Sequence, residues 1–196
     1  MANKIYALVG PHASGKTLLM NQLMGIGVHC IRTYTTREIS STDSDAEMYA
    51  HIDKMEFFKK DFIVKASYKG QYYGLLKQDV LNAMRDYAVS MVVIEANGLK
   101  QLSKLLKDSL ESIYIMCDYV TLVERMLKLG HNNEDIKYHL EFAENNGEFD
   151  TWKISTYVVK NVSEPRVALS QLLSIMGLTQ LKPHDVLNQL LSAKAK

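Results

Sequence analysis

The sequence has almost no excess charge of either sign. Of its 196 residues, 23 are Lys or Arg and 22 are Asp or Glu, so the formal net charge is only +1. A protein that attracts nucleic acid or an anionic membrane through its overall field carries a clear basic excess. The composition therefore gives no reason to expect a nucleic-acid or membrane partner.

Long apolar runs and paired cysteines are also lacking. No run approaches the roughly 18 apolar residues that a membrane-spanning helix needs, and the N-terminal stretch MANKIYALVG lacks the apolar segment of a secretory signal. The only two cysteines, Cys30 and Cys117, lie far apart and match no metal-ligand spacing. We expect both to be small core residues in a reducing compartment, and we expect a cytosolic (cytoplasmic) protein.

Short apolar runs alternate with amphipathic segments along most of the chain. Strands are expected at residues 5–9, 28–33, 112–117 and 156–159, and in SMVVIEANG, where Gly98 closes the strand. Helices are expected at residues 16–24, 77–86, 99–110, 119–129, 133–144 and 164–176. No repeat or low-complexity segment interrupts this order. The pattern predicts one α/β domain with a central, mostly parallel sheet flanked by helices, and with insertions near residues 34–75 and 129–153.

Residues 10–17 read GPHASGKT and fit the pattern G-x-x-x-x-G-K-[ST] of a phosphate-binding loop, here called the P-loop. A strand precedes the motif and a helix follows it, which is the context that a nucleotide triphosphate site needs. Lys16 is then expected to reach the β- and γ-phosphates, and the Thr17 hydroxyl to bind Mg²⁺. The candidate ATP-binding residues are Gly10, Pro11, His12, Ala13, Ser14, Gly15, Lys16 and Thr17. A chance match is the alternative, and His12 is interpreted as a tolerated variable position.

Three further stretches and one tyrosine resemble the guanylate kinase family. TYTTREIS at residues 33–40 resembles the family's S-x-T-T-R-x-x-R, and Tyr49 lies at the family's distance from the arginine. GQYYG at residues 70–74 is similar to G-N-Y-Y-G, and VIEANG at residues 93–98 stands where the family has D-I-D-x-Q-G. The matches occur in the family's order and extend from the P-loop to about Met176.

This resemblance implies a P-loop kinase with a core, an insertion that binds a nucleoside monophosphate (NMP), and a mobile lid. It places Arg37 on the acceptor phosphate, because a planar guanidinium can bind two phosphate oxygens at once, and it adds the hydroxyls of Tyr49 and Tyr73. Thr33 occupies the family's first base-side position. For each tyrosine, simple packing is the alternative role.

The departures from the family pattern affect the base pocket. Ser40 replaces the second phosphate-binding arginine, Val64 replaces the glutamate that accepts hydrogen bonds from guanine, and Leu75 replaces a serine or threonine. A valine cannot accept from guanine N–H groups, and each donor left unpaired in a closed site costs roughly 1–3 kcal/mol. We therefore expect the acceptor base to be less hydrogen-bonded than guanine, with thymine or another pyrimidine as a candidate.

The catalytic and lid positions also depart from the family. Of the two acids in the family's D-I-D, Glu95 remains and Val93 replaces the other; Arg125 matches a lid arginine, whereas Leu129 and His139 replace two more. Positioned positive charge is the main source of catalysis in phosphoryl transfer, so these losses predict a slower enzyme or another source of charge.

Three side chains lie close enough in sequence to replace the lost arginines, namely Lys128, Lys137 and His139. The alternative for both lysines is an ordinary solvated helix charge. Asn161 in VVKN matches a family asparagine near the ATP base.

The chain beyond residue 176 is interpreted as a separate C-terminal extension, residues 177–196. Pro183 is expected to begin an amphipathic helix that docks on the core or on a second subunit. The second alternative would make the protein a homodimer.

Together these features predict an ATP- and Mg²⁺-dependent nucleoside monophosphate kinase that is not strictly specific for guanine. The alternatives are a catalytically degenerate nucleotide-binding or protein-interaction module and a kinase of a phosphorylated sugar.

Overall fold

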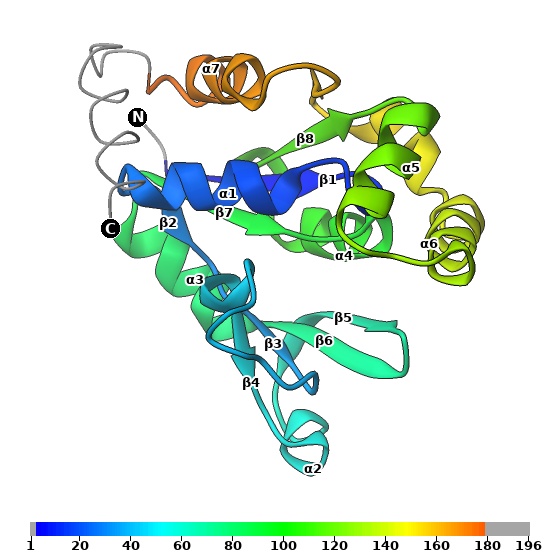
Figure 1. Cartoon of the computed structure of the whole chain (residues 1–196). Coiled ribbons are helices and arrows are strands. Elements are labelled where there is room, and N and C mark those ends of the chain that lie inside the picture. The colour runs from blue at the N-terminus through cyan, green and yellow to red at the C-terminus, as the bar shows by residue number, and fades with distance from the viewer. Residues whose placement is uncertain (1–2, 179–196) are drawn as a thin grey trace.

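The computed structural model describes residues 3–178, and Figure 1 shows the arrangement of its helices and strands. A five-stranded sheet forms the centre, and a smaller four-stranded sheet projects from it as a separate lobe. Two helices at the far end of the central sheet form a third part. The mixture of a parallel sheet and flanking helices confirms the predicted fold class.

The central sheet is entirely parallel. Its strands run in the order β2-β7-β1-β8-β9, and each pair of neighbours is parallel. The strands are β1 (Lys4–Val9), β2 (His29–Cys30), β7 (Val89–Val93), β8 (Leu110–Met116) and β9 (Tyr157–Lys160). Because β1 lies in the middle of the sheet, the loop that follows it at Gly10 opens at the centre of the carboxyl edge. Ligands bind at this edge in open α/β sheets.

Side chains of β1 alternate between two hydrophobic layers. Tyr6 and Leu8 pack with α1 (Lys16–Gly25) and α7 (Pro165–Ile175) on one face of the sheet. Ile5, Ala7 and Val9 pack with α3 (Lys77–Asp86) and α4 (Ala96–Leu106) on the other face. A strand that is apolar on both faces reads as a continuous hydrophobic run, as IYALV does in this sequence.

The insertion predicted at residues 34–75 forms the second sheet. Its strands run in the order β4-β3-β6-β5, with β3 and β4 parallel and the other pairs antiparallel. They are β3 (Thr33–Thr35), β4 (Tyr49–His51), β5 (Phe62–Tyr68) and β6 (Gln71–Leu76), accompanied by α2 (Lys54–Phe57) and the short helix η1 (Ala46–Met48). Ile52, Phe57 and Phe62 give this lobe its own small core.

The lid predicted near residues 129–153 falls on α6 (Asn133–Asn145) and η3 (Glu148–Ile154), and α5 (Tyr119–Lys128) leads into it; we call α5, α6 and η3 together the lid. Side-chain caps fix where its helices begin: Asp118 Oδ1 accepts from Thr121 N at 2.9 Å, and Asn132 Oδ1 accepts from Asp135 N at 2.8 Å. The chain reverses between α5 and α6 at Gly130, whose φ is +85°. Buried contacts among Leu122, Met126 and Ile136 hold the two helices as a pair.

Two sequence-based boundaries were wrong for identifiable reasons. The strand expected at residues 28–33 divides into β2 and β3, because the chain leaves the central sheet after Cys30 and joins the insertion sheet at Thr33. Gly98 does not close a strand but lies inside α4. A Cβ at this glycine would lie 3.0 Å from Cγ1 of Val64, so its absence lets α4 pack closely against β5. The short helix η2 (Lys107–Ser109) links α4 to β8.

Both cysteines are free thiols in the structure. Cys117 is buried in the lid core, and Cys30 is partly buried beside α1 and α7. Their packing agrees with the expectation of small core residues.

The helix expected from Pro183 falls outside the described residues. Within residues 3–178, no helix is both long and apolar enough to cross a membrane.

Candidate active site

Most of the candidate site residues predicted from sequence line one open cavity of about 750 Å³ between the P-loop, the insertion and the lid. The cavity is lined by Gly10, His12, Ala13, Gly15, Lys16, Thr17, Thr33, Arg37, Tyr49, Val64, Tyr73, Leu75, Glu95, Arg125 and Asn161, among others. Of the predicted site residues, Pro11 and Ser14 do not line it. Segments far apart in the sequence thus converge at the carboxyl edge of the central sheet.

The P-loop backbone is shaped by two glycines with positive φ angles, +141° at Gly10 and +100° at Gly15. A Cβ at Gly15 would lie only 2.3 Å from Asn161 Nδ2, and one at Gly10 would lie 2.8 Å from the Ile115 carbonyl oxygen. Both positions therefore require glycine in backbone angle and in space. The Lys16 ammonium donates to the carbonyl oxygens of Gly10 at 2.7 Å and Pro11 at 2.8 Å.

Arg125 and Asn161 brace this loop from the lid side. Arg125 Nη1 donates to the Ser14 carbonyl at 3.2 Å, and Nη2 donates to the Asn161 carbonyl at 2.9 Å. Asn161 Nδ2 donates to the same Ser14 carbonyl at 2.8 Å. Asn161 is buried, and its Oδ1 finds no hydrogen-bond partner among the described residues. The structure thus places both side chains on the P-loop backbone, with one amide oxygen left to accept a hydrogen bond.

Arg37, Tyr49 and Tyr73 form a compact group on the opposite wall. The Arg37 guanidinium lies 5.4 Å from the centre of the Tyr49 ring, and the rings of Tyr49 and Tyr73 meet edge to face at 5.9 Å. Burial raises the pKa of both tyrosine hydroxyls, so they remain protonated donors at neutral pH.

Two carboxylates that sequence reasoning missed already occupy the Arg37 guanidinium. Asp43 Oδ2 accepts from Nη1 at 2.9 Å, and Asp45 Oδ1 accepts from Nη2 at 2.9 Å. Both stand in the polar stretch SSTDSDAE of the insertion, which carries no motif of its own. Their grip shows that Arg37 can hold two anionic oxygens at once.

The wall beside this group is apolar. Val64 of β5 pairs with Leu75 of β6 across the insertion sheet; Val64 is 5% exposed and Leu75 is fully buried. Thr33 and Ala66 also line this part of the cavity. None of these four side chains carries a carboxylate or an amide, and Thr33 supplies their single hydroxyl.

Two carboxyl groups, those of the partly buried Glu95 and the buried Glu148, lie near the P-loop lysine. Burial and then the nearby Glu148 raise the pKa of Glu95 to about 7. Burial raises the pKa of Glu148 as well, and burial lowers the pKa of Lys16 to about 8 despite both acids. Glu148 was missed by sequence reasoning, because it lies in a short helix with no motif of its own.

Replacing Glu95 by Gln is expected to stabilise the nucleotide-free protein in a pH-dependent way. The folded protein holds the Glu95 proton more tightly than the unfolded chain, so ionisation removes stability as the pH rises from 4.5 through about 7. We expect the melting temperature of Glu95→Gln to exceed that of the unchanged protein by roughly 3–8 °C at pH 8 and by little at pH 5.

Calorimetry at both pH values tests this, with the exposed Glu124→Gln as the matched control. If the melting temperatures of Glu95→Gln and the unchanged protein differed equally at pH 5 and pH 8, the pKa of Glu95 would not be shifted by folding.

The lid positions treated as replacements for lost arginines differ in their placement. Lys128 lines the cavity, whereas Lys137 is exposed and pairs with Glu141 at 3.7 Å, as expected for a solvated helix charge. His139 lines the cavity but cannot supply positive charge, because burial and then the neighbouring Lys69 lower its pKa to about 4. Leu129 is 66% exposed at the cavity rim.

Comparison with known proteins agrees with the geometry of the site. The guanylate kinase family model matches residues 2–164, which is most of the chain. The chain belongs to the guanylate kinase family. The guanylate kinase of Bartonella henselae is 28% identical over 163 residues, covering 80% of this chain and 73% of that protein. The guanylate kinase of Maricaulis maris is 29% identical over 186 residues, covering 91% of this chain and 84% of that protein.

A solved structure supports the same fold. The crystal structure of guanylate kinase from Anaplasma phagocytophilum superposes with a TM-score of 0.68 at 18% identity, covering 93% of this chain and 88% of that one. Membership in the guanylate kinase family confirms the resemblance noted in the sequence and makes the chain a nucleoside monophosphate kinase by class. The roles of individual residues remain predictions.

Proposed function

We propose that this guanylate kinase family member transfers the γ-phosphoryl group of ATP, bound with Mg²⁺, to a nucleoside monophosphate without strict selectivity for guanine. One observation carries the proposal. The P-loop, with Lys16, and the group of Arg37, Tyr49 and Tyr73 line the same cavity from opposite sides. A donor and an acceptor held there would each have their phosphates on a positively charged group.

The donor side fits a triphosphate. The Gly10 and Gly15 backbone forms a cradle that a single Cβ would fill, and Lys16 is bonded only to neutral oxygen atoms. Within the described residues Lys16 makes no ion pair, so its charge is available to an anion. Thr17, at the start of α1, would hold Mg²⁺, and ATP would supply the phosphoryl group. Asn161 Oδ1 would accept from the adenine base.

On the acceptor side, Arg37 would bind the monophosphate in the place of Asp43 and Asp45. The guanidinium now binds one oxygen from each of the two carboxylates, and a phosphate can present two oxygens at the same positions. A phosphate also carries more negative charge than a single carboxylate, which favours its binding to Arg37 in their place. The protonated hydroxyls of Tyr49 and Tyr73 would add neutral donors, which orient a phosphate without introducing a competing anion.

The remaining polar residues would position charge between the two phosphates. Arg125, held against the Ser14 carbonyl, and Lys128 at the rim bring positive charge from the lid, where it can oppose the charge that develops during transfer. Glu95, with a pKa of about 7, is suited to hold a proton or a water near the acceptor. Closure of the lid would exclude bulk water.

Base selectivity follows from the apolar wall at Val64 and Leu75. The guanine edge carries N–H donors, and neither side chain has an atom that can accept a hydrogen bond from them. Guanine therefore lacks the binding advantage of roughly 1–3 kcal/mol that each satisfied donor would give it over other bases. The two curated relatives above are named guanylate kinases, and they favour a kinase over the scaffold and sugar-kinase alternatives.

Replacing Val64 by Glu tests the base-pocket argument directly. We expect kcat/KM for GMP, relative to that for dTMP, to rise about 5- to 100-fold, because one carboxylate can accept from two guanine donors. The measurement is steady-state kinetics with both acceptors at saturating Mg-ATP, and Val64→Leu is the matched control without an acceptor atom.

Two results would contradict the argument. One is an unchanged protein that already prefers GMP by more than about 100-fold, which is the selectivity expected of an intact hydrogen-bonding pocket. The other is a folded Val64→Glu variant, verified by circular dichroism, whose preference does not move.

A further inference from the structure

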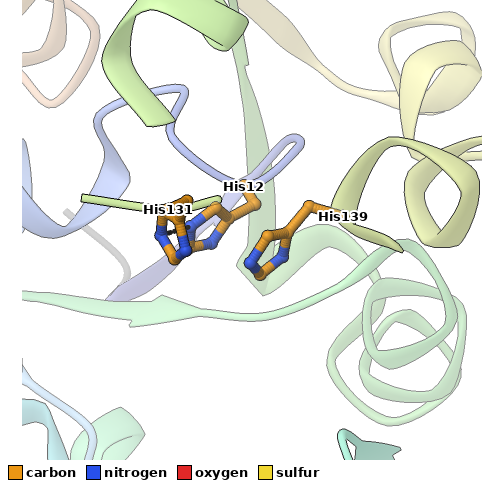
Figure 2. A group of neighbouring side chains, drawn as sticks. All are labelled: His12, His131 and His139. Carbon is orange, nitrogen blue, oxygen red and sulfur yellow. Dashed lines mark hydrogen bonds between the residues drawn. The ribbon is translucent and has the colours of Figure 1, made fainter. Parts of the chain in front are cut away.

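Three histidines from separate parts of the chain meet at the mouth of the P-loop. His12 belongs to the P-loop, His131 to the turn between α5 and α6, and His139 to α6 (Figure 2). One ring nitrogen from each lies within 4.8 Å of the others, and the Nε2 atoms of His12 and His131 are 3.3 Å apart. The His12 and His139 rings stack at 3.9 Å. Nothing in the P-loop motif requires a histidine at this position, because it is one of the variable residues.

His139 carries a buried nitrogen that lacks a partner. The residue is only 4% exposed, and its Nε2 has no hydrogen-bond partner within residues 3–178. Its other ring nitrogen, Nδ1, is hydrogen-bonded to the Tyr68 hydroxyl. A buried polar atom without a partner destabilises the fold, so this nitrogen marks a place where a ligand would be stabilising.

We propose that His12, His131 and His139 form a binding site for a divalent transition-metal ion such as Zn²⁺, which links the P-loop to the lid. The site is separate from the Mg²⁺ that accompanies ATP at Thr17. Imidazole nitrogen suits Zn²⁺, Cu²⁺ or Ni²⁺, whereas Mg²⁺ prefers oxygen ligands.

The distances agree with a four-coordinate ion. Two nitrogens bound at 2.0–2.1 Å to one tetrahedral Zn²⁺ stand about 3.4 Å apart, close to the 3.3 Å between His12 and His131. The third nitrogen lies within 4.8 Å of the others, so it has to approach by up to about 1.4 Å, and the His139 ring has to leave its stack on His12. Three protein ligands leave the fourth position for water or a phosphate oxygen, as in open zinc sites.

Tyr68 completes the arrangement behind the site. If His139 Nδ1–H donates to the Tyr68 hydroxyl, the Nε2 lone pair is free to bind a metal. Tyr68 is itself fixed by edge-to-face packing on Phe142 at 4.7 Å. Neutral imidazole is the form that binds a metal.

An ion at this site would join the α5–α6 turn to the P-loop and hold the lid against the donor side of the cavity. Lys69, paired with Asp135 at 2.9 Å, and Lys16 are the cations nearby, and Glu148 is an anion on the cavity wall.

The experiment titrates Zn²⁺ alone into the nucleotide-free full chain against a chromophoric chelator. We expect the unchanged chain to bind one equivalent of Zn²⁺ tightly. We expect the affinity to fall at least about 100-fold in His131→Ala and in His139→Ala. The matched control is His29→Ala, which removes a histidine from the far side of β7 and is expected to change affinity less than about 2-fold. Because His131 lies on an exposed turn, its variant keeps the test valid if His139→Ala does not fold.

Co²⁺ in place of Zn²⁺ gives a second readout, because a four-coordinate site with nitrogen ligands produces strong visible d–d absorption. We expect that absorption in the unchanged protein and its loss in His131→Ala. The proposal is overturned if the unchanged chain binds Zn²⁺ no more tightly than His131→Ala, or if bound Co²⁺ gives only the weak spectrum of a six-coordinate ion. Neither readout depends on kinase turnover, so the site is tested independently of the proposed function.

Discussion

Replacing Lys16 by Ala is expected to lower kcat for phosphoryl transfer by about 10³-fold or more, with a smaller effect on acceptor KM. Within residues 3–178, Lys16 brings the only ammonium that bonds to the P-loop carbonyls, and it makes no ion pair there. Its charge is therefore free to stabilise the transferred group in the transition state. The substitution leaves the glycine cradle in place, so nucleotide binding falls less than turnover.

Steady-state kinetics of ADP release measure this effect, and Lys137→Ala is the matched control. Lys137 is an exposed lysine of the lid that does not line the cavity, and its removal is expected to change kcat by less than about 2-fold. Comparable losses in both variants would mean that the P-loop lysine has no special role.

Replacing Arg37 by Ala is expected to lower kcat/KM for the acceptor by about 10²–10⁴-fold, mostly through KM. The guanidinium offers two parallel donors, which Asp43 and Asp45 now accept at 2.9 Å each. Removing it deletes two charge-assisted hydrogen bonds to the acceptor phosphate. Arg37→Lys is expected to recover little, because an ammonium cannot bind two oxygens in the same fork.

The control for Arg37 is Arg32→Ala, which removes an exposed arginine that is not in the cavity wall. The KM of Mg-ATP serves as an internal reference and is expected to stay within about 3-fold, since Arg37 lies on the acceptor side. If Arg37→Ala raised the KM of the acceptor and the KM of Mg-ATP equally, Arg37 would not act specifically on the acceptor.

Much of the fold could be predicted from sequence because its signals are local. The apolar run before Gly10, the GKT turn and the amphipathic helix that follows are contiguous, and each is determined by a few residues. The predicted bounds of helices and strands were wrong where tertiary packing decides them. Gly98 is one case, because a helix that must approach Val64 closely uses a glycine in its interior.

The acceptor side could be predicted only through its resemblance to a family. Arg37, Tyr49 and Tyr73 are separated by 12 and 24 residues along the chain, and no periodicity links them. The family's spacing indicated them, and the structure places them in one group. The same comparison identified Val64 and Leu75 as departures, which now form an apolar wall.

The residues that sequence reasoning missed depend on contacts that only folding creates. Asp43 and Asp45 lie in a polar loop whose composition says nothing about Arg37, and Glu148 reaches Lys16 from 132 residues away. The histidines were interpreted one at a time: His12 as a variable position and His139 as a substitute for an arginine. Their convergence depends on how the chain folds, because His131 and His139 lie more than 110 residues from His12 in sequence.

Coupled ADP release from Mg-ATP tests the central claim most directly, measured against GMP, dGMP, AMP, CMP, UMP and dTMP with Lys16→Ala as the background. We predict acceptor-dependent release well above that background, with at least one pyrimidine monophosphate within about 10-fold of GMP or ahead of it in kcat/KM. If no acceptor raises release above the Lys16→Ala background, the chain is not a nucleoside monophosphate kinase in practice and the account is contradicted.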